Sequence, residues 1–120
     1  MKLINSKTEQ DIREQLIKSH KSLFEDEEER RLLTVIRKNF SNMLTAYILH
    51  WIPEQGEDFY KILINDSIVV GIELDKVNQD TIPIMSSMPV SKYKLGLSRV
   101  NQIRLIIAID LAQKDLKKKN

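Results

Sequence analysis

Residues 44–75 constrain the fold of this chain more than any other stretch. They contain three runs rich in aliphatic and aromatic residues, at positions 44–52, 59–64 and 68–74. Such residues fit the pleated, half-buried surface of a β-sheet. Pro53 ends the first run because it lacks the N–H that a strand ladder needs, and an Asn-Asp-Ser triplet supplies turn chemistry before the third run. We therefore predict three antiparallel strands joined as a meander.

Side-chain alternation assigns faces to the predicted strands. With a period of two, every second residue from 68 to 74 is aliphatic, and we expect this face to be the core face. In the first strand both alternating sets are largely apolar, so we expect it to be central and at least partly covered on both sides. The same alternation places His50 with Ile48, and Trp51 on the opposite face with Leu49. Gly71 indicates a bulge or a close backbone approach.

Helical patterns flank the strands on both sides. Residues 6–9, Ser-Lys-Thr-Glu, match the capping box and predict a helix from about residue 7 to 23. A second apolar stripe predicts a helix that ends near Asn39. Ser98 is a suitable N-cap for a final amphipathic helix that reaches about Lys117.

The segment from residue 76 to 97 is too long for an unstructured loop in a small domain. We expect a fourth, edge strand over residues 81–85, an irregular stretch over 86–90 and a short helical turn over 91–95. The sequence thus predicts a single α+β domain spanning residues 1–120. Its parts are two N-terminal helices, an antiparallel β-meander of three to four strands, and a C-terminal helix packed on the sheet.

The chain lacks the residues that several classes of function require. Cysteine is absent, which excludes thiol nucleophiles, disulfides and thiolate metal sites. His20 and His50 are the two histidines, and neither has partners at the spacing of a triad or a metal set, so we interpret both as structural. The glycines are isolated, which argues against a phosphate-binding loop. We therefore expect no enzyme activity, no metal and no cofactor.

Localisation follows from the lengths of the apolar runs. None approaches the roughly 20 residues that cross a bilayer, and the apolar part of the N-terminus is too short for a secretory signal. We expect a cytoplasmic protein with no membrane association.

Charge is distributed unevenly along the chain. Residues 54–80 contain two basic and seven acidic residues, a net charge of −5, whereas residues 81–120 contain eight basic and two acidic residues, a net charge of +6. Acidic groups around aromatic anchors suit an interface with a basic protein. The predicted contact residues are Trp51, Glu54, Glu57, Asp58, Tyr60, Asp66, Glu73 and Asp75.

This pattern leads to a functional hypothesis. We expect a small protein-binding module, of the immunity or antitoxin type, that neutralises a basic toxin or nuclease through its acidic hairpin. The acidic run at residues 25–29 is interpreted as a solvated helix start, with a cation site or a basic-partner site as the alternative.

Three alternatives remain open. The hairpin carboxylates could serve a small metal-dependent nucleic-acid-processing enzyme, although Asp75 and Lys76 are adjacent and point to opposite faces of a strand. The Lys and Arg residues of the C-terminal third could contact nucleic acid weakly and in a salt-dependent way. A free sheet edge could also pair with a second copy of the chain and form a homo-oligomer.

Overall fold

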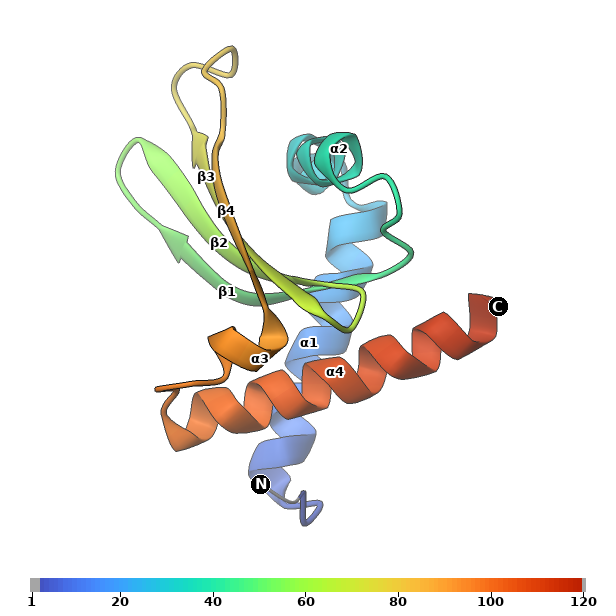
Figure 1. Ribbon diagram of the computed structural model, residues 1–120. Coiled ribbons are helices and arrows are strands. Elements are labelled where there is room, and N and C mark those ends of the chain that lie inside the picture. The colour runs from blue at the N-terminus through green and yellow to red at the C-terminus, as the bar shows by residue number, and fades with distance from the viewer. Residues whose placement is uncertain (1–2, 120) are drawn as a thin grey trace.

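A computed structural model describes residues 3–119 of the chain and shows helices packed around one four-stranded sheet (Figure 1). The strands are antiparallel and lie in the order β1-β2-β3-β4, which is a simple meander. The α+β prediction is confirmed. In chain order the elements are α1 (Lys7–Glu25), the 3-10 turn η1 (Glu27–Glu29), α2 (Arg30–Asn39), β1 (Ala46–Pro53), β2 (Glu57–Ile64), β3 (Ile68–Asp75), β4 (Ile84–Pro89), α3 (Val90–Tyr93) and α4 (Arg99–Lys119).

The helix starts follow local sequence signals. At α1 the hydroxyl of Ser6 accepts the backbone N–H of Glu9 at 3.2 Å, and the Glu9 carboxylate accepts the N–H of Ser6 at 3.2 Å, so the predicted capping box is confirmed. At α4 the Ser98 hydroxyl accepts the N–H of Asn101 at 3.2 Å. These caps satisfy N–H groups that have no partner inside the helix.

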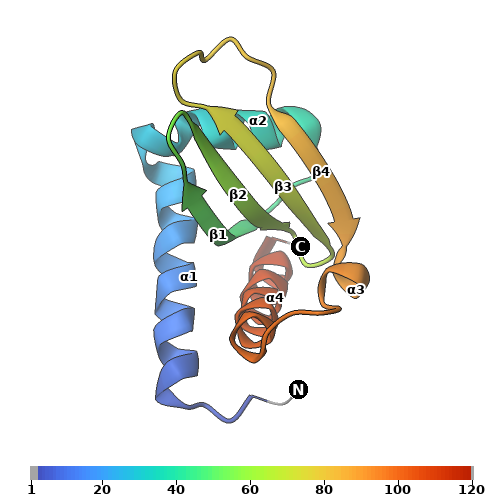
Figure 2. The same ribbon diagram turned by 90° about the vertical axis from the view of Figure 1, so that its left-hand side faces the viewer.

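Helices cover the sheet on both faces (Figure 2). On one side, which we call the α2 face, Ile62 and Ile72 are buried with Ile36 of α2. On the other side, the α4 face, Leu63 is buried with Ile107 of α4. The predicted core face is therefore confirmed, and the opposite face forms a second core. In Figure 2, α4 crosses the end of the sheet near the β2–β3 turn, and the strands extend beyond it.

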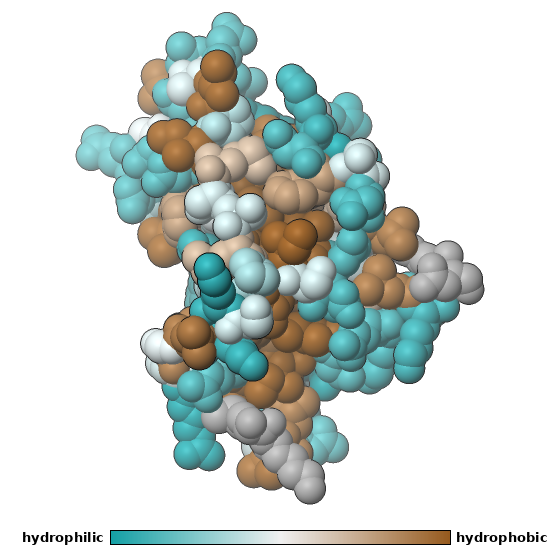
Figure 3. All heavy atoms as spheres, in the orientation of Figure 1, coloured by the Kyte–Doolittle hydropathy of each residue, from teal (hydrophilic) through white to brown (hydrophobic). Residues whose placement is uncertain are grey.

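Apolar side chains also gather on the surface of the molecule. Figure 3 shows a band of apolar side chains down the middle of the face seen in Figure 1, with hydrophilic side chains on both sides of it. Within the described residues, no helix combines the length and the apolar character needed to cross a membrane.

β1 lies at an edge of the sheet, so its predicted central position is wrong. Both of its faces are nonetheless covered, and α1 runs beside it (Figure 2). His20 of α1 donates from Nδ1 to the carbonyl oxygen of Ala46 at 2.8 Å, and its ring stacks on Tyr47 with 4.5 Å between centroids. Both faces of β1 are apolar because helices pack on both of them. Helix α1 also lies along the edge of this strand, where backbone N–H and C=O groups would otherwise be open to another strand.

A β-bulge interrupts β1 between Ile48 and His50. Beyond it, His50 pairs with Lys61 and Trp51 pairs with Tyr60. One extra residue resets the period of two, so each side chain after it changes face. The faces predicted for His50 and Trp51 by strict alternation are therefore wrong.

The fourth strand begins later than predicted, at Ile84 instead of residue 81. Met85 pairs with Ile72 and Pro89 with Ile68, so the stretch expected to be irregular is part of the ladder. The strand starts directly after Pro83, which has no N–H to donate to a neighbouring strand. The N–H of Val90 then bonds the carbonyl oxygen of Ser67 at 2.9 Å, at the start of α3.

All three tyrosines are shielded from water to a degree that changes their titration. Burial, and then a hydrogen bond to Asp115, raise the pKa of Tyr47. Burial, and then the neighbouring carboxylates of Glu29 and Asp58, raise the pKa of Tyr60, and burial raises that of Tyr93. In each case the folded state favours the protonated phenol.

We expect phenolate formation to coincide with alkaline unfolding. A folded-state pKa above the unfolded value of about 10 stabilises the fold fully below that pH, and this stabilisation is lost as pH rises toward the folded-state pKa. Absorbance at the phenolate band and far-ultraviolet circular dichroism, recorded together from neutral pH upward, should change in one transition. A phenolate signal at about pH 10 with the fold intact would contradict this expectation.

Candidate functional site

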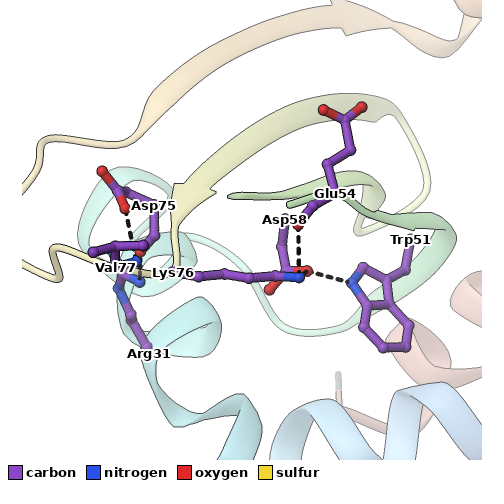
Figure 4. A network of polar contacts seen from close by, with 7 residues as sticks. All are labelled: Arg31, Trp51, Glu54, Asp58, Asp75, Lys76 and Val77. Carbon is purple, nitrogen blue, oxygen red and sulfur yellow. Dashed lines mark hydrogen bonds and ion pairs between the residues drawn. The ribbon is translucent and has the colours of Figure 1, made fainter. Parts of the chain in front are cut away.

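Trp51 stands at the end of the β1–β2 hairpin and is held in one orientation although 58% of its surface is exposed. Its indole Nε1 donates to Asp58 at 3.1 Å, and its ring stacks on Tyr60 with 6.4 Å between centroids and 10° between planes. Asp58 also pairs with Lys76 at 3.2 Å, and Lys76 donates to the carbonyl oxygen of Glu54 at 2.9 Å (Figure 4). These contacts fix the indole at the surface.

Asp75 forms hydrogen bonds with the loop that follows it. Its carboxylate accepts the N–H groups of Val77 and Asn78 at 2.8 and 3.0 Å and the hydroxyl of Thr81 at 3.2 Å. The backbone N–H bonds lower the pKa of this carboxyl and keep it charged. Its backbone carbonyl accepts Arg31 of α2 at 2.5 Å (Figure 4). Asp75 therefore orders the β3–β4 loop at the same end of the sheet as Trp51.

The acidic run between α1 and α2 lies beside the hairpin. Burial raises the pKa of Glu29, and the carboxylates of Asp26, Asp58 and Glu28 raise it further. Glu29 also lines one hollow together with Trp51 and Tyr60, so the α1–α2 corner and the hairpin share one surface. We call this surface the acidic end, and it consists of Asp26, Glu28, Glu29, Glu54, Glu57 and Asp58. The sequence interpretation of a solvated helix start missed this proximity.

The structure separates the other predicted contact residues. Asp66 lies in the β2–β3 turn, at the far end of the sheet from the hairpin. Glu73 is on the α4 face of β3 and is paired with Phe59. Tyr60 is only 7% exposed and lies under Trp51, so it supports the indole. Of the eight predicted residues, four remain together as accessible groups of the acidic end and its anchor. They are Trp51, Glu54, Glu57 and Asp58.

Two hollows flank Trp51 between α1 and β1. The first, of about 260 Å³, is also lined by His50 and by Arg104 of α4, and we call it the basic hollow. The second, of about 320 Å³, is also lined by Glu29 and Tyr60 on the side of the acidic end. Residues that line both hollows are Gln15, Ser19, Ile48 and Trp51. The second hollow also contains Lys18 of α1 beside Glu29, and Trp51 forms a wall that the two hollows share.

The basic hollow was not anticipated from the sequence. Burial lowers the pKa of His50, and the positive charges of Arg104 and Lys61 lower it further. His50 pairs with Lys61 across the strands because of the bulge in β1, and Arg104 lines the hollow with His50 because α4 packs on this face. The one sequence signal for it was the excess of cations in the C-terminal third.

Gly71 of β3 leaves room for the Lys61 side chain. A Cβ at residue 71 would lie 3.2 Å from the Lys61 Nζ and 3.0 Å from the Ser86 Oγ. The register of β3 continues unbroken on both sides of Gly71, so of the two predicted roles the close approach is confirmed and the bulge is wrong.

The carboxylates do not assemble into a metal site. Across residues 3–119, no three His, Asp or Glu side chains are placed so that they could hold one metal ion. Asp75 and Asp58, which a metal-dependent mechanism would recruit, are instead bonded to the protein itself.

Comparisons of the chain with protein-family models, with curated proteins and with solved structures returned no match. The site is therefore interpreted from its own residues. These residues present a fixed aromatic side chain, Trp51, with the acidic end beside it and the basic hollow between α1 and β1 next to it.

Proposed function

We propose that the protein is a non-catalytic, cytoplasmic binding module whose acidic end docks on a basic surface of another protein. Such a surface suits an immunity or antitoxin protein that occludes a basic toxin or nuclease. The observation that carries this proposal is the exposed Trp51, which Asp58 and Tyr60 hold in place beside the carboxylates of the acidic end.

A fixed, exposed tryptophan suits binding for an energetic reason. Tryptophan is enriched among the few interface residues that carry most of the binding free energy. A side chain already held in its bound orientation loses little conformational entropy when the partner arrives. Because Asp58 and Tyr60 hold the ring at the surface, Trp51 meets both conditions.

The carboxylates contribute in a different way. Rim charges mainly accelerate encounter with a partner of opposite charge and make association dependent on salt. Glu54 is exposed and Glu57 half-exposed, and neither takes part in a side-chain ion pair among the described residues. They are therefore available to a basic partner. Asp58 is already engaged with Lys76 and Trp51, so its main role is to hold the anchor.

The test begins with a tagged pull-down from the native host, which identifies a stoichiometric basic protein. For that purified partner we expect Trp51→Ala to raise the equilibrium dissociation constant by about 30-fold, which corresponds to a loss of roughly 2 kcal/mol of binding free energy. We expect Glu54→Lys to slow association and to flatten its salt dependence, with little change in dissociation. Surface plasmon resonance at several salt concentrations measures both rates.

A matched control uses the same charge change at the other end of the sheet. Asp66→Lys alters net charge as much as Glu54→Lys but lies in the β2–β3 turn, so association should remain close to that of the unmodified protein. Equal losses in the two variants would show that only net charge matters. Undiminished affinity in Trp51→Ala would show that the partner binds elsewhere, and either outcome would refute the proposal.

A further inference from the structure

A third hollow, of about 350 Å³, lies between α3 and the first half of α4, and we call it the α3–α4 groove. It shares no lining residue with the two hollows beside Trp51. The two helices lie side by side in both ribbon views (Figures 1 and 2). Four lining residues recur at spacings of three and four along α4, so they share one side of that helix. They are Gln102, Leu105, Ile106 and Ile109, and the other lining residues are Val90, Lys94 and Leu95.

Hydrogen bonds hold both walls of the groove in place. The N–H of Val90 bonds the carbonyl oxygen of Ser67 at 2.9 Å, which ties α3 to the β2–β3 turn, and the N–H of Lys94 bonds the carbonyl oxygen of Val90 at 3.0 Å. The side-chain amide of Gln102 donates to the carbonyl oxygen of Leu97 at 3.0 Å and so ties the connection between the two helices to α4. The groove is therefore a fixed feature of the fold.

Two apolar side chains of the groove belong to neither core of the protein. Leu95 is 72% exposed, and Ile106 is partly buried but packs into neither core. Val90, Leu105 and Ile109 contribute to the core on the α4 face and also line the groove. An apolar chain that displaced water from between these groups would be stabilised by the hydrophobic effect. The walls therefore suit an apolar ligand.

The charge around the groove is positive. Residues 81–109 contain four basic residues and no acidic one, and α3 and the first half of α4 fall within this range. Lys94 is exposed and takes part in no ion pair among the residues that the structure describes. A lysine can lay its methylene groups along an apolar surface while its ammonium stays in water. The groove thus combines apolar walls with one unpaired cation among its lining residues.

We infer that the α3–α4 groove binds a free medium-chain alkyl carboxylate, with the alkyl chain between the helices and the carboxylate at Lys94. The positive charge selects a carboxylate over an amine with the same chain. The volume of about 350 Å³ lies within the range of about 300–1,000 Å³ that is typical of small-molecule sites. The inference is independent of the acidic end and of its partner.

The first experiment titrates the unmodified protein with hexanoate, octanoate and decanoate, followed by calorimetry. We expect saturable binding at one site per chain. Each additional methylene group that enters the groove should tighten binding by about fourfold, because its burial removes apolar surface from water. In NMR spectra, octanoate should shift the methyl resonances of Leu95, Ile106 and Ile109 and leave those of Ile17 on α1 unchanged.

A comparison of head groups tests the role of Lys94. Octanoate should bind more tightly than octanol or octylamine, which have the same alkyl chain. Lys94→Gln should weaken octanoate binding by about fivefold, the upper end for an exposed ion pair, and should leave octanol binding within about twofold. Lys117→Gln makes the same charge change at an exposed position near the other end of α4, so octanoate binding should stay within about twofold.

A bulky side chain should close the groove. Ile106→Trp places an indole among the lining residues without removing a side chain from either core. We expect octanoate affinity to fall by about tenfold or more, because the alkyl chain loses its apolar contacts. Ile17→Trp makes the same change at a half-exposed position of α1 and should leave affinity within about twofold. Circular dichroism verifies that both variants are folded, and Lys94→Gln tests the groove at an exposed position if Ile106→Trp is not.

Three results would overturn the inference. One is octanoate binding to the unmodified protein that does not saturate. Another is octylamine binding as tight as that of octanoate, since Lys94 would then play no part. The last is an equal loss of octanoate affinity in Ile17→Trp and Ile106→Trp, which would place the ligand outside the groove.

Discussion

Replacement of Leu63 by alanine should lower the free energy of unfolding by about 2–5 kcal/mol, as much as replacement of its neighbour Ile62. Both side chains are fully buried in the second strand of the sheet, and they point to opposite faces. Ile62 packs in the core beneath α2, and Leu63 packs in the core with Ile107 of α4. Each truncation removes apolar burial and leaves a cavity that close-packed neighbours fill only in part.

Urea denaturation of the two variants measures this effect, and Ile84→Ala provides the control. Ile84 is also an aliphatic residue in a strand, but it is 66% exposed on β4 and its truncation should change stability by only about 0.5 kcal/mol. A sheet covered on one side alone would give one large and one small value for Ile62 and Leu63. A near-neutral Leu63→Ala would therefore refute the packing of α4 on the sheet.

Removal of the Asp115 carboxylate should destabilise the protein by about 3 kcal/mol, the second large effect that we expect. One oxygen of Asp115 accepts the Thr45 hydroxyl at 2.7 Å and the Tyr47 hydroxyl at 2.5 Å. Thr45 is fully buried and Tyr47 nearly so. In Asp115→Ala both hydroxyls lose their acceptor, and buried donors without a partner are costly. The same bonds tie the last turns of α4 to the start of β1.

Asp115→Asn separates hydrogen bonding from charge. The amide oxygen of Asn can replace the carboxylate oxygen as acceptor, so this variant should retain most of the stability that Asp115→Ala loses. Thermal unfolding of both variants under one buffer condition makes the comparison. Similar losses in the two would show that charge, and not the pair of hydroxyl bonds, anchors the helix.

The parts of the fold that could be predicted from the sequence are those set by neighbours along the chain. The capping box at Ser6 and Glu9 spans four residues, and the cap at Ser98 is equally local. The parts that could not be predicted depend on distant segments. The edge position of β1 is hidden because α1 and the helices on both faces bury it as though it were central. The late start of β4 follows from its register with β3.

The candidate site also combines groups that are neighbours along the chain with groups that are distant in the sequence. Glu54, Glu57 and Asp58 lie together because they share one tight turn, and Trp51 lies just before it. Asp66 lies apart from them because a strand eight residues long carries it to the other end of the sheet. No pattern along the chain predicts that Glu29 lines a hollow with Trp51, or that Arg104 lines a hollow with His50. Helix docking brings these charges together.

The bulge in β1 determines which side of the sheet its last residues face. Leu49 has no ladder partner on β2, and it lies on the same face as the next residue, His50. Deletion of Leu49 would leave His50 opposite Lys61 and Trp51 opposite Tyr60, so both pairs would survive in a strand one residue shorter. Loss of the bulge at unchanged length would instead continue the register of the first half of β1 and place His50 opposite Tyr60. The indole and the imidazole would then exchange faces, with every charged residue still present.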